Sequence, residues 1–237
     1  MSCLLSIRDA AIDPLWSGLN LDIHPGDFIA VLGPNGVGKS TLLHAILGTR
    51  DLSAGSISVS GRIGYIPQQR MFPEDLPLRA KDLVSLSLEH RVFRRRRSGA
   101  LRGDVEKLLE YVGATGIANR RVGTLSGGQQ QLVRQAQALA NDPELLLCDE
   151  PLLSLDMGMQ QRMVDVLAKR QAAKNTAVLF VTHSINPVLQ HVTRVLYFGP
   201  NGHTIGAVSD VMNSQTLSAL YGAKVEVVRV GDRLVVV

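Results

Sequence analysis

A glycine-rich loop constrains this chain more than any other part of it. The loop matches the phosphate-binding pattern G-x-x-x-x-G-K-S/T and consists of Gly33, Pro34, Asn35, Gly36, Val37, Gly38, Lys39, Ser40 and Thr41. Glycines let consecutive backbone N–H groups point toward one small anionic surface, and they leave no side chain in the way. The apolar run 28–32 predicts a buried strand before the loop, and helical spacing of leucine and isoleucine predicts a helix from about Lys39. Strand, loop and helix N-terminus together predict a site for nucleotide phosphates.

Two side chains of the loop have predicted roles at such a site. Lys39 is expected to reach the β- and γ-phosphates, because its long side chain carries a positive charge. The Ser40 hydroxyl is expected to bind Mg²⁺. The positive end of the helix dipole lies beneath the same phosphates and adds to the attraction.

The rest of the composition is typical of a globular domain. The chain has 237 residues, of which 45% are hydrophobic and 19% charged, which suits one domain with a sizeable core. No apolar run approaches the roughly 20 residues that span a bilayer, and residues 1–8 lack the pattern of a signal peptide. Cys3 and Cys148 form no metal-binding motif and favour a reducing compartment. The net charge of +4 argues for neither nucleic acid nor membrane.

Predicted strands and helices alternate along most of the chain, which indicates an α/β fold with a mainly parallel sheet. A mostly helical stretch from Arg79 to about Asn141 interrupts this alternation and predicts an inserted subdomain. Two short strands, 57–59 and 62–66, are expected to meet at a turn at Ser60-Gly61. Further strands are predicted at 4–7, 19–23, 145–148, 177–181, 225–230 and 234–237, and helices at 104–112, after Ser126 and at 158–174.

Two adjacent acids end the predicted strand 145–148. Ligands of open α/β sheets bind beyond the carboxyl ends of the strands, where Asp149 and Glu150 lie. Asp149 is expected to hold Mg²⁺ together with Ser40. Glu150 is expected to face elsewhere, because successive strand residues alternate, and to accept a proton from the water that attacks the γ-phosphate.

Two further polar residues follow predicted strands. His183 ends the strand 177–181 and could hydrogen-bond the γ-phosphate or orient the attacking water. Gln68 could contact Mg²⁺ or the water through a neutral amide, although Gln69 fits nearly as well.

A second glycine-rich segment precedes a predicted helix and consists of Leu125, Ser126, Gly127, Gly128 and Gln129. Ser126 and the glycine amides form a second anion-binding helix N-terminus. One small domain seldom needs two such sites for one nucleotide. A head-to-tail pair of chains explains both, with Ser126 of each chain capping the γ-phosphate held by the other.

The order of these motifs resembles the nucleotide-binding subunit of ABC transporters. The resemblance runs from near the N-terminus to about residue 200, and the Leu-Ser-Gly-Gly-Gln segment is its most specific part. It implies a Walker A loop at 33–41, a Q-loop at Gln68, a Walker B strand with a catalytic Glu150, a D-loop at Asp156 and a switch histidine at His183. It further implies two ATP molecules with Mg²⁺ between two copies of the chain, and closure that drives transmembrane permease subunits.

The same resemblance implies a fold and a location. The fold is a P-loop NTPase (RecA-like) core at 1–78 and 143–208, with a small antiparallel β subdomain, a helical subdomain at about 79–142 and an extension at about 209–237. Together these form a single ABC ATP-binding domain over 1–237. The expected location is the cytoplasmic face of the cell membrane, through the permease subunits.

The subtype resembles the zinc and manganese importers. Leu76-Pro77-Leu78, Lys81 to Val84 and the tail from Leu217 to Val230 carry this similarity. Iron-chelate and cobalamin importers remain open as alternatives, as does a soluble ABC ATPase acting on the ribosome or DNA. An importer would add a substrate-binding protein as partner, and no nucleic acid is expected. The transported substrate is not encoded in the motifs.

Several positions depart from the family. Trp16 is the one nearby aromatic candidate for stacking on adenine, although its register suits a core residue. Leu132 and Gln137 replace arginines of the signature helix, and the pair Leu152-Leu153 replaces small hydroxyl residues. These changes put hydrogen bonds across the dimer in question. The basic run at 90–91 and 94–97 reads as a solvated loop or as a contact with lipid or permease.

Overall fold

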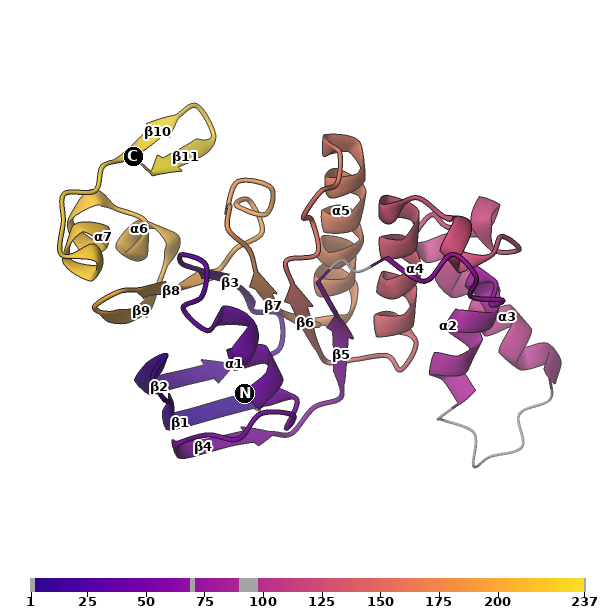
Figure 1. The fold of residues 1–237 in the computed structure, drawn as a ribbon, viewed down its shortest axis with the longest axis horizontal. Coiled ribbons are helices and arrows are strands. Elements are labelled where there is room, and N and C mark those ends of the chain that lie inside the picture. Colours follow the sequence, from indigo (N-terminus) through magenta and orange to yellow (C-terminus); the bar gives the residue numbers. More distant parts are fainter. Residues whose placement is uncertain (1–2, 69–70, 90–97, 237) are drawn as a thin grey trace.

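A six-stranded sheet forms the centre of the fold (Figure 1), as a computed structural model that describes residues 3–68, 71–89 and 98–236 shows. Its strand order is β5-β6-β7-β3-β8-β9. All neighbours are parallel except β8 and β9. The strands are β3 (Phe28–Leu32), β5 (Ile63–Ile66), β6 (Leu145–Asp149), β7 (Ala177–Val181), β8 (Arg194–Gly199) and β9 (Gly202–Gly206). Every residue of β3, β6 and β7 is buried, as expected of parallel strands covered on both faces.

A second, antiparallel sheet covers one face of the first. It contains β1 (Leu5–Ile12), β2 (Trp16–Ile23) and β4 (Ala54–Val59) in the order β2-β1-β4. Helix α1 (Lys39–Ile46) packs with this sheet, and both share a core with Ile29 and Val31 of β3. Phe28 and Ala30 point to the opposite core, because side chains alternate along a strand. The predicted α/β fold with an antiparallel β subdomain is confirmed.

The predicted turn at Ser60-Gly61 does not join a hairpin. β4 pairs with β1, whereas β5 pairs with β6 of the other sheet. Ser60 N donates to Leu4 O at 2.9 Å and thus stays with the antiparallel sheet. Arg62 N, two residues later, donates to Glu144 Oε2 at 3.0 Å, beside the start of β6. The chain crosses between sheets here, and these long-range partners override the local turn signal.

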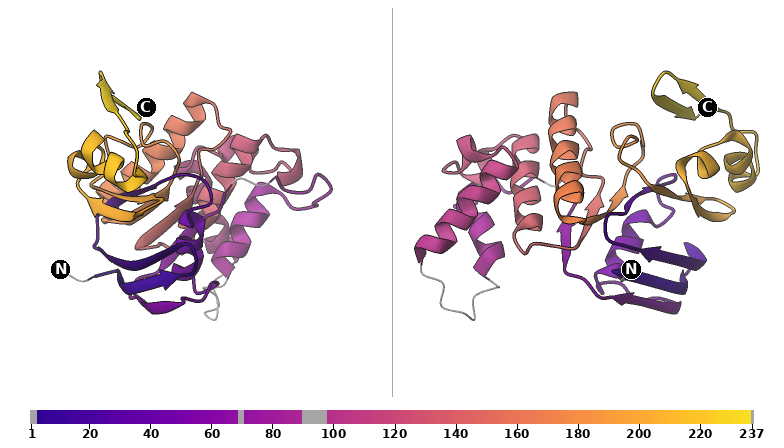
Figure 2. Two further views of the ribbon diagram at one scale, coloured as in Figure 1. Left: turned by 60° about the vertical axis from the view of Figure 1, so that its left-hand side comes forward. Right: turned by 180° about the vertical axis from the view of Figure 1, so that it is seen from behind.

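Helices flank the sheet at one end and the C-terminal elements lie at the other (Figures 1 and 2). Between β5 and β6 the chain forms α2 (Ala80–Glu89), α3 (Ser98–Tyr111), the 3₁₀ turns Thr115–Ile117 and Val122–Thr124, and α4 (Gly127–Leu139). α5 (Met157–Lys174), α6 (Val208–Val211), α7 (Ser214–Tyr221), β10 (Val227–Val230) and β11 (Arg233–Val236) complete the chain. No helix within the described ranges is long and apolar enough to cross a membrane.

Helix α3 begins at Ser98, earlier than the predicted start at Asp104. Leu101 packs against the core and thus supports the additional helical turn before Asp104. The division into core 1–78 and 143–208, helical subdomain 79–142 and extension 209–237 stays a prediction.

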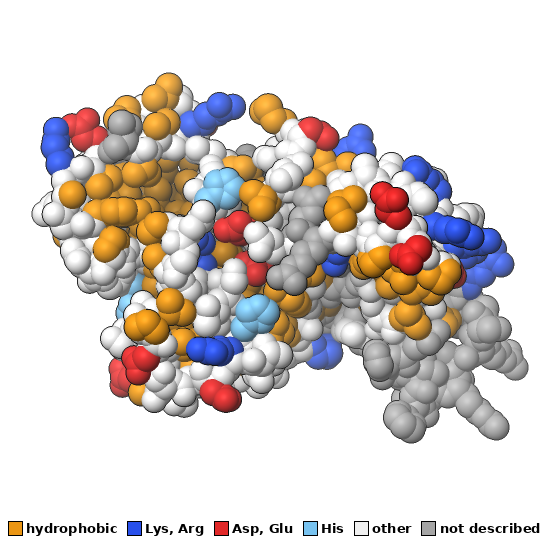
Figure 3. Space-filling model, viewed as in Figure 1, with side chains coloured by type: hydrophobic (Ala, Val, Ile, Leu, Met, Phe, Trp, Pro, Cys, Tyr) orange, Lys and Arg blue, Asp and Glu red, His pale blue; other side chains and the backbone are white. Residues whose placement is uncertain are grey.

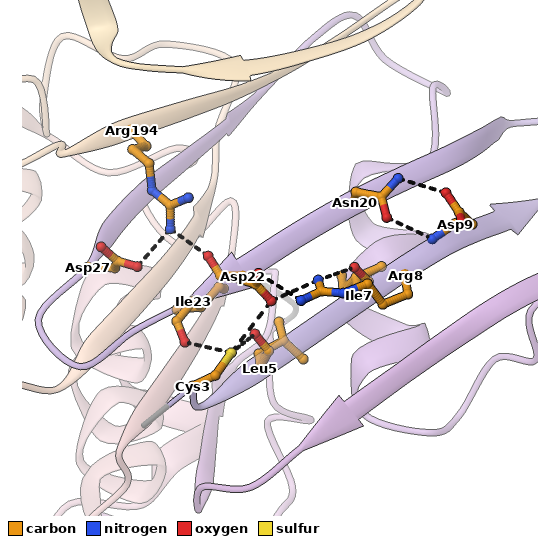
Figure 4. A network of polar contacts seen from close by, with 10 residues as sticks. All are labelled: Cys3, Leu5, Ile7, Arg8, Asp9, Asn20, Asp22, Ile23, Asp27 and Arg194. Atoms are coloured by element: carbon orange, nitrogen blue, oxygen red, sulfur yellow. Dashed lines mark hydrogen bonds and ion pairs between the residues drawn. The ribbon is translucent and has the colours of Figure 1, made fainter. Parts of the chain in front are cut away.

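A polar network links β8 of the main sheet to the antiparallel sheet (Figure 4). Arg194 Nη2 on β8 donates to Asp22 O on β2 at 2.6 Å and to Asp27 Oδ2 at 2.7 Å. Arg8 forms an ion pair with Asp22 at 2.8 Å, and its hydrogen bond lowers the pKa of that carboxyl group. This network fixes how the antiparallel sheet sits under the main sheet.

Candidate functional site

The phosphate loop connects β3 to α1 and is closed by the side chain of Lys39. Lys39 Nζ donates to Gly33 O and to Pro34 O, each at 2.9 Å. The side chain is only 5% exposed, and this burial lowers the pKa of Lys39, while the charges of Glu150 and Asp149 oppose the shift. Within the described part of the chain, the bonds of this buried ammonium group go to carbonyl oxygens, which an anion can replace, so the loop fits a phosphate group.

The glycines of the loop allow it to lie directly on neighbouring strands. Gly33 has φ +139°, and a Cβ atom there would lie 2.3 Å from Phe198 O on β8. Gly38 has φ +95°, and a Cβ atom there would lie 2.8 Å from Trp16 Nε1. Only glycine fits both the backbone angles and the space.

Trp16 lies behind the phosphate loop and is 6% exposed. Its indole Nε1 donates to Gly38 O at 3.4 Å, and its ring centroid is 6.0 Å from that of Phe198. The ring therefore supports the loop from behind and offers no open face to a base. Adenine stacking on Trp16, which the sequence left open, does not fit this burial.

Ser40 and Asp149 meet between the start of α1 and the end of β6. Ser40 Oγ donates to Asp149 Oδ1 at 2.7 Å, and Tyr65 OH donates to Asp149 Oδ2 at 3.5 Å. Asp149 is 3% exposed. A hydroxyl and a carboxylate converging next to a phosphate loop are ligands that Mg²⁺ prefers, so these two residues fit the metal.

Glu150 follows Asp149 but leaves the strand. Its φ is +44°, a left-handed conformation that is uncommon for a residue with a side chain. Glu150 N donates to Val181 O at 3.0 Å, which fixes this bend against β7. The backbone bend separates the half-buried Glu150 side chain from Asp149, and such strained positions cluster at active sites.

His183 and Gln68 lie at the same edge of the sheet. His183 follows β7, is exposed and lines one pocket with Gly33, Pro34 and Asn35 of the loop. Gln68 follows β5 and is exposed, whereas Gln69 lies outside the described residues. Acidic, basic and histidine side chains gather near the middle of this face (Figure 3). The structure thus brings the loop, Asp149, Glu150 and His183 together, and Gln68 follows β5, the strand next to β6.

The segment Leu125 to Gln129 starts α4, on the far side of α5 from α1 (Figure 1). Ser126 Oγ accepts from Gln129 N, and Gln129 Oε1 accepts from Ser126 N, which forms a capping box. Leu125 is buried, and a Cβ atom on Gly128 would lie 3.0 Å from Met159 Cγ on α5. Ser126 shares a pocket with Arg120 and Thr124, and none of the described loop residues lines that pocket. One copy of the chain therefore does not bring its two glycine-rich sites together.

Asp156 caps the next helix, because its Oδ1 accepts from Met159 N at 2.9 Å at the start of α5. The positions that depart from the family pack within the chain. Leu132 and Leu152 are buried, and Gln137 Nε2 donates to Leu83 O and Ser87 Oγ, each at 3.2 Å. The basic run at 90–91 and 94–97 lies outside the described residues.

Sequence reasoning missed three polar residues near the site. Tyr65 hydrogen-bonds Asp149, Thr182 closes a turn around His183, and Asn186 bonds the C-terminal hairpin. No motif marks Tyr65 or Asn186, since their partners are far away in the sequence. Thr182 could have been found as the residue that joins β7 to His183.

Fold and site together define a phosphate-loop NTPase: a parallel sheet with a Walker-type loop, a strand-end aspartate and a neighbouring glutamate. The ABC transporter family model matches residues 16–153, and the chain belongs to this family. It is an ATP-binding subunit of the ABC type and an ATPase.

Curated relatives and solved structures agree. The zinc import ATP-binding protein ZnuC of Cereibacter sphaeroides is 35% identical over 212 residues, covering 89% of this chain and 83% of the relative. The molybdate import ATP-binding protein MolC of Haemophilus influenzae is 34% identical over 209 residues, covering 87% and 81%. An inward-facing ABC transporter described as metal-chelate type has a TM-score of 0.85 at 29% identity, covering 99% of this chain and 96% of that one.

A dimeric ATP-binding cassette in a post-hydrolysis state with ADP and Pi has a TM-score of 0.73 at 26% identity. It covers 81% of this chain and 93% of that chain. Related cassettes therefore assemble as pairs.

Proposed function

We propose that this chain is the ATP-hydrolysing subunit of a metal-ion importer of the zinc and manganese type. The observation that carries the ATPase is the meeting of Lys39, Ser40, Asp149 and Glu150 at one edge of the sheet. Support for import of zinc comes from the names of relatives such as ZnuC. MolC and the taurine import protein TauB are similarly close, and they keep other importers open as alternatives.

The first proposed step is capture of ATP by the loop. The γ- and β-phosphates take the place of Gly33 O and Pro34 O as partners of Lys39, while the loop N–H groups surround them. Ser40 and Asp149 would hold Mg²⁺, with Gln68 close by, and the metal would neutralise phosphate charge. This arrangement binds the triphosphate with its last phosphate facing the sheet edge.

Hydrolysis then depends on Glu150 and His183. Glu150 accepts a proton from the attacking water, and this makes the water oxygen a better nucleophile. His183, exposed beside the loop, hydrogen-bonds the γ-phosphate or orients the water. Without these side chains the nucleotide would bind but turn over slowly.

Ser126 and the residues around it, 125–129, are proposed to complete the site from a second copy of the chain. The helix N-terminus of α4 supplies N–H groups and a positive dipole to the γ-phosphate held by the partner. Asp156 at the start of α5 would lie in the same interface. Closure of two copies around two nucleotides is the proposed power stroke.

The motion is proposed to pass to permease subunits through the loop after Gln68. Phe72 N donates to Gln130 Oε1 at 2.9 Å, and the Arg134 guanidinium lies 4.1 Å from the centre of the Phe72 ring. Met71 is 58% exposed and lies next to this anchor. Phe72 thus anchors this part of the loop to α4, and the exposed Met71 side chain beside it is available to a partner. The proposed partners are transmembrane permease subunits, which would hold this chain at the cytoplasmic face of the membrane, and, for an importer, a substrate-binding protein.

Glu150→Gln tests the catalytic assignment. We expect ATP binding to persist and kcat to fall by about 10² or more, the usual contribution of a general base. Glu110→Gln is the matched control, because Glu110 is an exposed acid on α3, and it should hydrolyse ATP at the parent rate. A Glu150→Gln chain with the parent kcat would remove Glu150 as the base.

Co-purification tests the transport assignment. A membrane subunit that co-purifies, with ATPase of the reconstituted complex stimulated by a zinc- or manganese-loaded binding protein, supports metal import. Stimulation by molybdate or taurine systems alone would assign a different importer. Co-sedimentation with ribosomes or DNA would instead contradict transport.

A further inference from the structure

The side chain of Asn186, near the site, binds the C-terminal hairpin, which has no part in the proposed function. β10 and β11 form a hairpin that belongs to neither sheet. Asn186 Nδ2 donates to Leu234 O at 3.0 Å, and Asn186 Oδ1 accepts from Leu234 N at 2.9 Å. A single amide therefore grips β11 at both backbone groups of one residue.

The grip fits the geometry of the hairpin. Val230 and Arg233 are paired across the turn at 231–232, and Leu234 pairs with Arg229. Because backbone groups alternate in direction along an antiparallel strand, those of Leu234 face the outer edge of the hairpin. The Asn186 amide forms hydrogen bonds with both backbone groups of Leu234, as a third strand would. An amide offers a donor and an acceptor side by side, whereas a carboxylate lacks the donor and alanine lacks both.

Asn186 follows His183 closely in the same loop. Thr182 Oγ1 donates to Ser184 O at 2.9 Å and accepts from Ser184 N at 3.2 Å, which closes a turn around His183. Thr182 N donates to Val31 O at 3.1 Å and ties this turn to β3. His183 thus lies within a turn that is fixed to the sheet, three residues before Asn186, which is fixed to the hairpin.

The hairpin also borders the nucleotide edge itself. Val235 and Val236 of β11 line the same pocket as His183, Gly33 and Asn35. Val230, beside the turn of the hairpin, is 62% exposed. The hairpin therefore borders the site through Val235 and Val236 and contacts the core through Val227 and Leu234.

We infer that the C-terminal hairpin 227–236 is a positioning element for ATP hydrolysis, which acts through the Asn186 amide on the loop that carries His183. Asn186 is a positioning residue and does not touch the nucleotide. The inference rests on the proposed role of His183. It adds a dependence of turnover on a segment outside every motif of the family.

Steady-state ATPase kinetics of the full-length chain test the inference. For Asn186→Ala we expect kcat to fall on the order of tenfold, since even a 1 Å misplacement of a catalytic group can cost about 10². KM for ATP should stay within about twofold, because Lys39 and the loop are untouched. Asn186→Asp keeps the acceptor and loses the donor, so its kcat should lie between those of the parent chain and Asn186→Ala.

A substitution of Leu234, the hydrogen-bond partner of Asn186, makes the test specific. Leu234→Pro removes the N–H group at the outer edge, where proline is tolerated because no hairpin hydrogen bond is lost. Its kcat should fall as well, and the double variant Asn186→Ala/Leu234→Pro should be no slower than the slower single variant. Losses that multiply in the double variant would mean that the two residues act separately and would overturn the inference.

Asn20→Ala is the matched control. Asn20 forms a comparable grip on Asp9 in the antiparallel sheet (Figure 4), with Asp9 N donating to Asn20 Oδ1 at 3.0 Å and Asn20 Nδ2 donating to Asp9 Oδ1 at 2.8 Å. Its kcat should equal that of the parent chain. An equal loss of kcat in Asn20→Ala would show that general loosening explains the effect and would overturn the inference.

His183→Ala separates this inference from the proposed function. If His183→Ala lowers kcat and neither Asn186→Ala nor Leu234→Pro does, the hairpin is not a positioning element and the proposed function stands. If His183→Ala leaves kcat at the parent value, the role of His183 fails and the inference fails with it. Thermal melting of each variant identifies any that do not fold, and Asn186→Asp and Leu234→Pro then decide the outcome.

Discussion

Gly33 shows, at the scale of one residue, how little freedom the phosphate loop has. Its φ of +139° excludes side chains in general, and the carbonyl of Phe198 occupies the place of a Cβ atom. Gly48 after α1 also has a positive φ, +70°, but no atom lies within 4 Å of its ideal Cβ. A substitution at Gly48 would therefore cause backbone strain alone, whereas one at Gly33 would add a steric clash.

Gly33→Ala and Gly48→Ala should differ in stability. Gly48→Ala should lower the free energy of unfolding by about 1 kcal/mol, the cost of a left-handed alanine. Gly33→Ala should lower it by about 3 kcal/mol, because overpacking against Phe198 adds to that strain. It should also weaken ATP binding. Denaturant titration of both variants measures the difference, and equal losses would contradict the tight seat of the loop on β8.

Helix α4 is the element with two tasks, because Ser126 caps it and is also proposed to bind a phosphate. Ser126 Oγ accepts from Gln129 N at 3.4 Å within the capping box. A structural cap and an anion site make different demands on the side chain. Asparagine, aspartate and serine all cap helices well, but a carboxylate repels phosphate.

Ser126→Asp and Ser126→Ala should therefore differ in their effect on stability. Ser126→Ala should lower the free energy of unfolding by about 1 kcal/mol, through loss of the cap. Ser126→Asp should keep parent stability and lose most ATPase activity, since its negative charge would face the γ-phosphate. Thermal unfolding and ATPase rates on the same samples check this. Parent-like activity of Ser126→Asp would leave α4 with the capping role alone.

The sequence predicted elements well where the signal was local. The loop 33–41 and the apolar strands β3, β6 and β7 follow from short patterns, and the structure contains them where expected. It failed where distant partners decide. β4 and β5 enter different sheets because Ser60 bonds Leu4 and Arg62 bonds Glu144. Trp16 is covered by a loop that only the tertiary fold brings over it.

The sequence predicted the residues of the site itself better than the residues that hold them in position. Motif spacing identified Lys39, Ser40, Asp149 and Glu150, whose joint position follows from parallel strands ending at one edge. No sequence pattern predicted the hydrogen bonds between the Asn186 amide and the backbone of Leu234, because two residues 48 positions apart form no motif.

At the scale of the whole molecule, the two glycine-rich sites define the central requirement for a partner. The phosphate loop lies at the start of α1 and the Ser126 segment at the start of α4, with α5 between them (Figures 1 and 2). We propose that each site is completed by the other copy, and the dimeric structures of related cassettes support this. The account therefore depends on two chains closing around the same nucleotide.

A structure of the Glu150→Gln chain with Mg²⁺ and ATP tests this requirement most directly, because slow turnover should trap the closed pair. We expect a symmetric dimer in which Ser126 Oγ of each copy lies about 3 Å from a γ-phosphate oxygen held by Lys39 of the other. An ATP-loaded complex in which Ser126 of both copies lies far from either γ-phosphate would contradict the account.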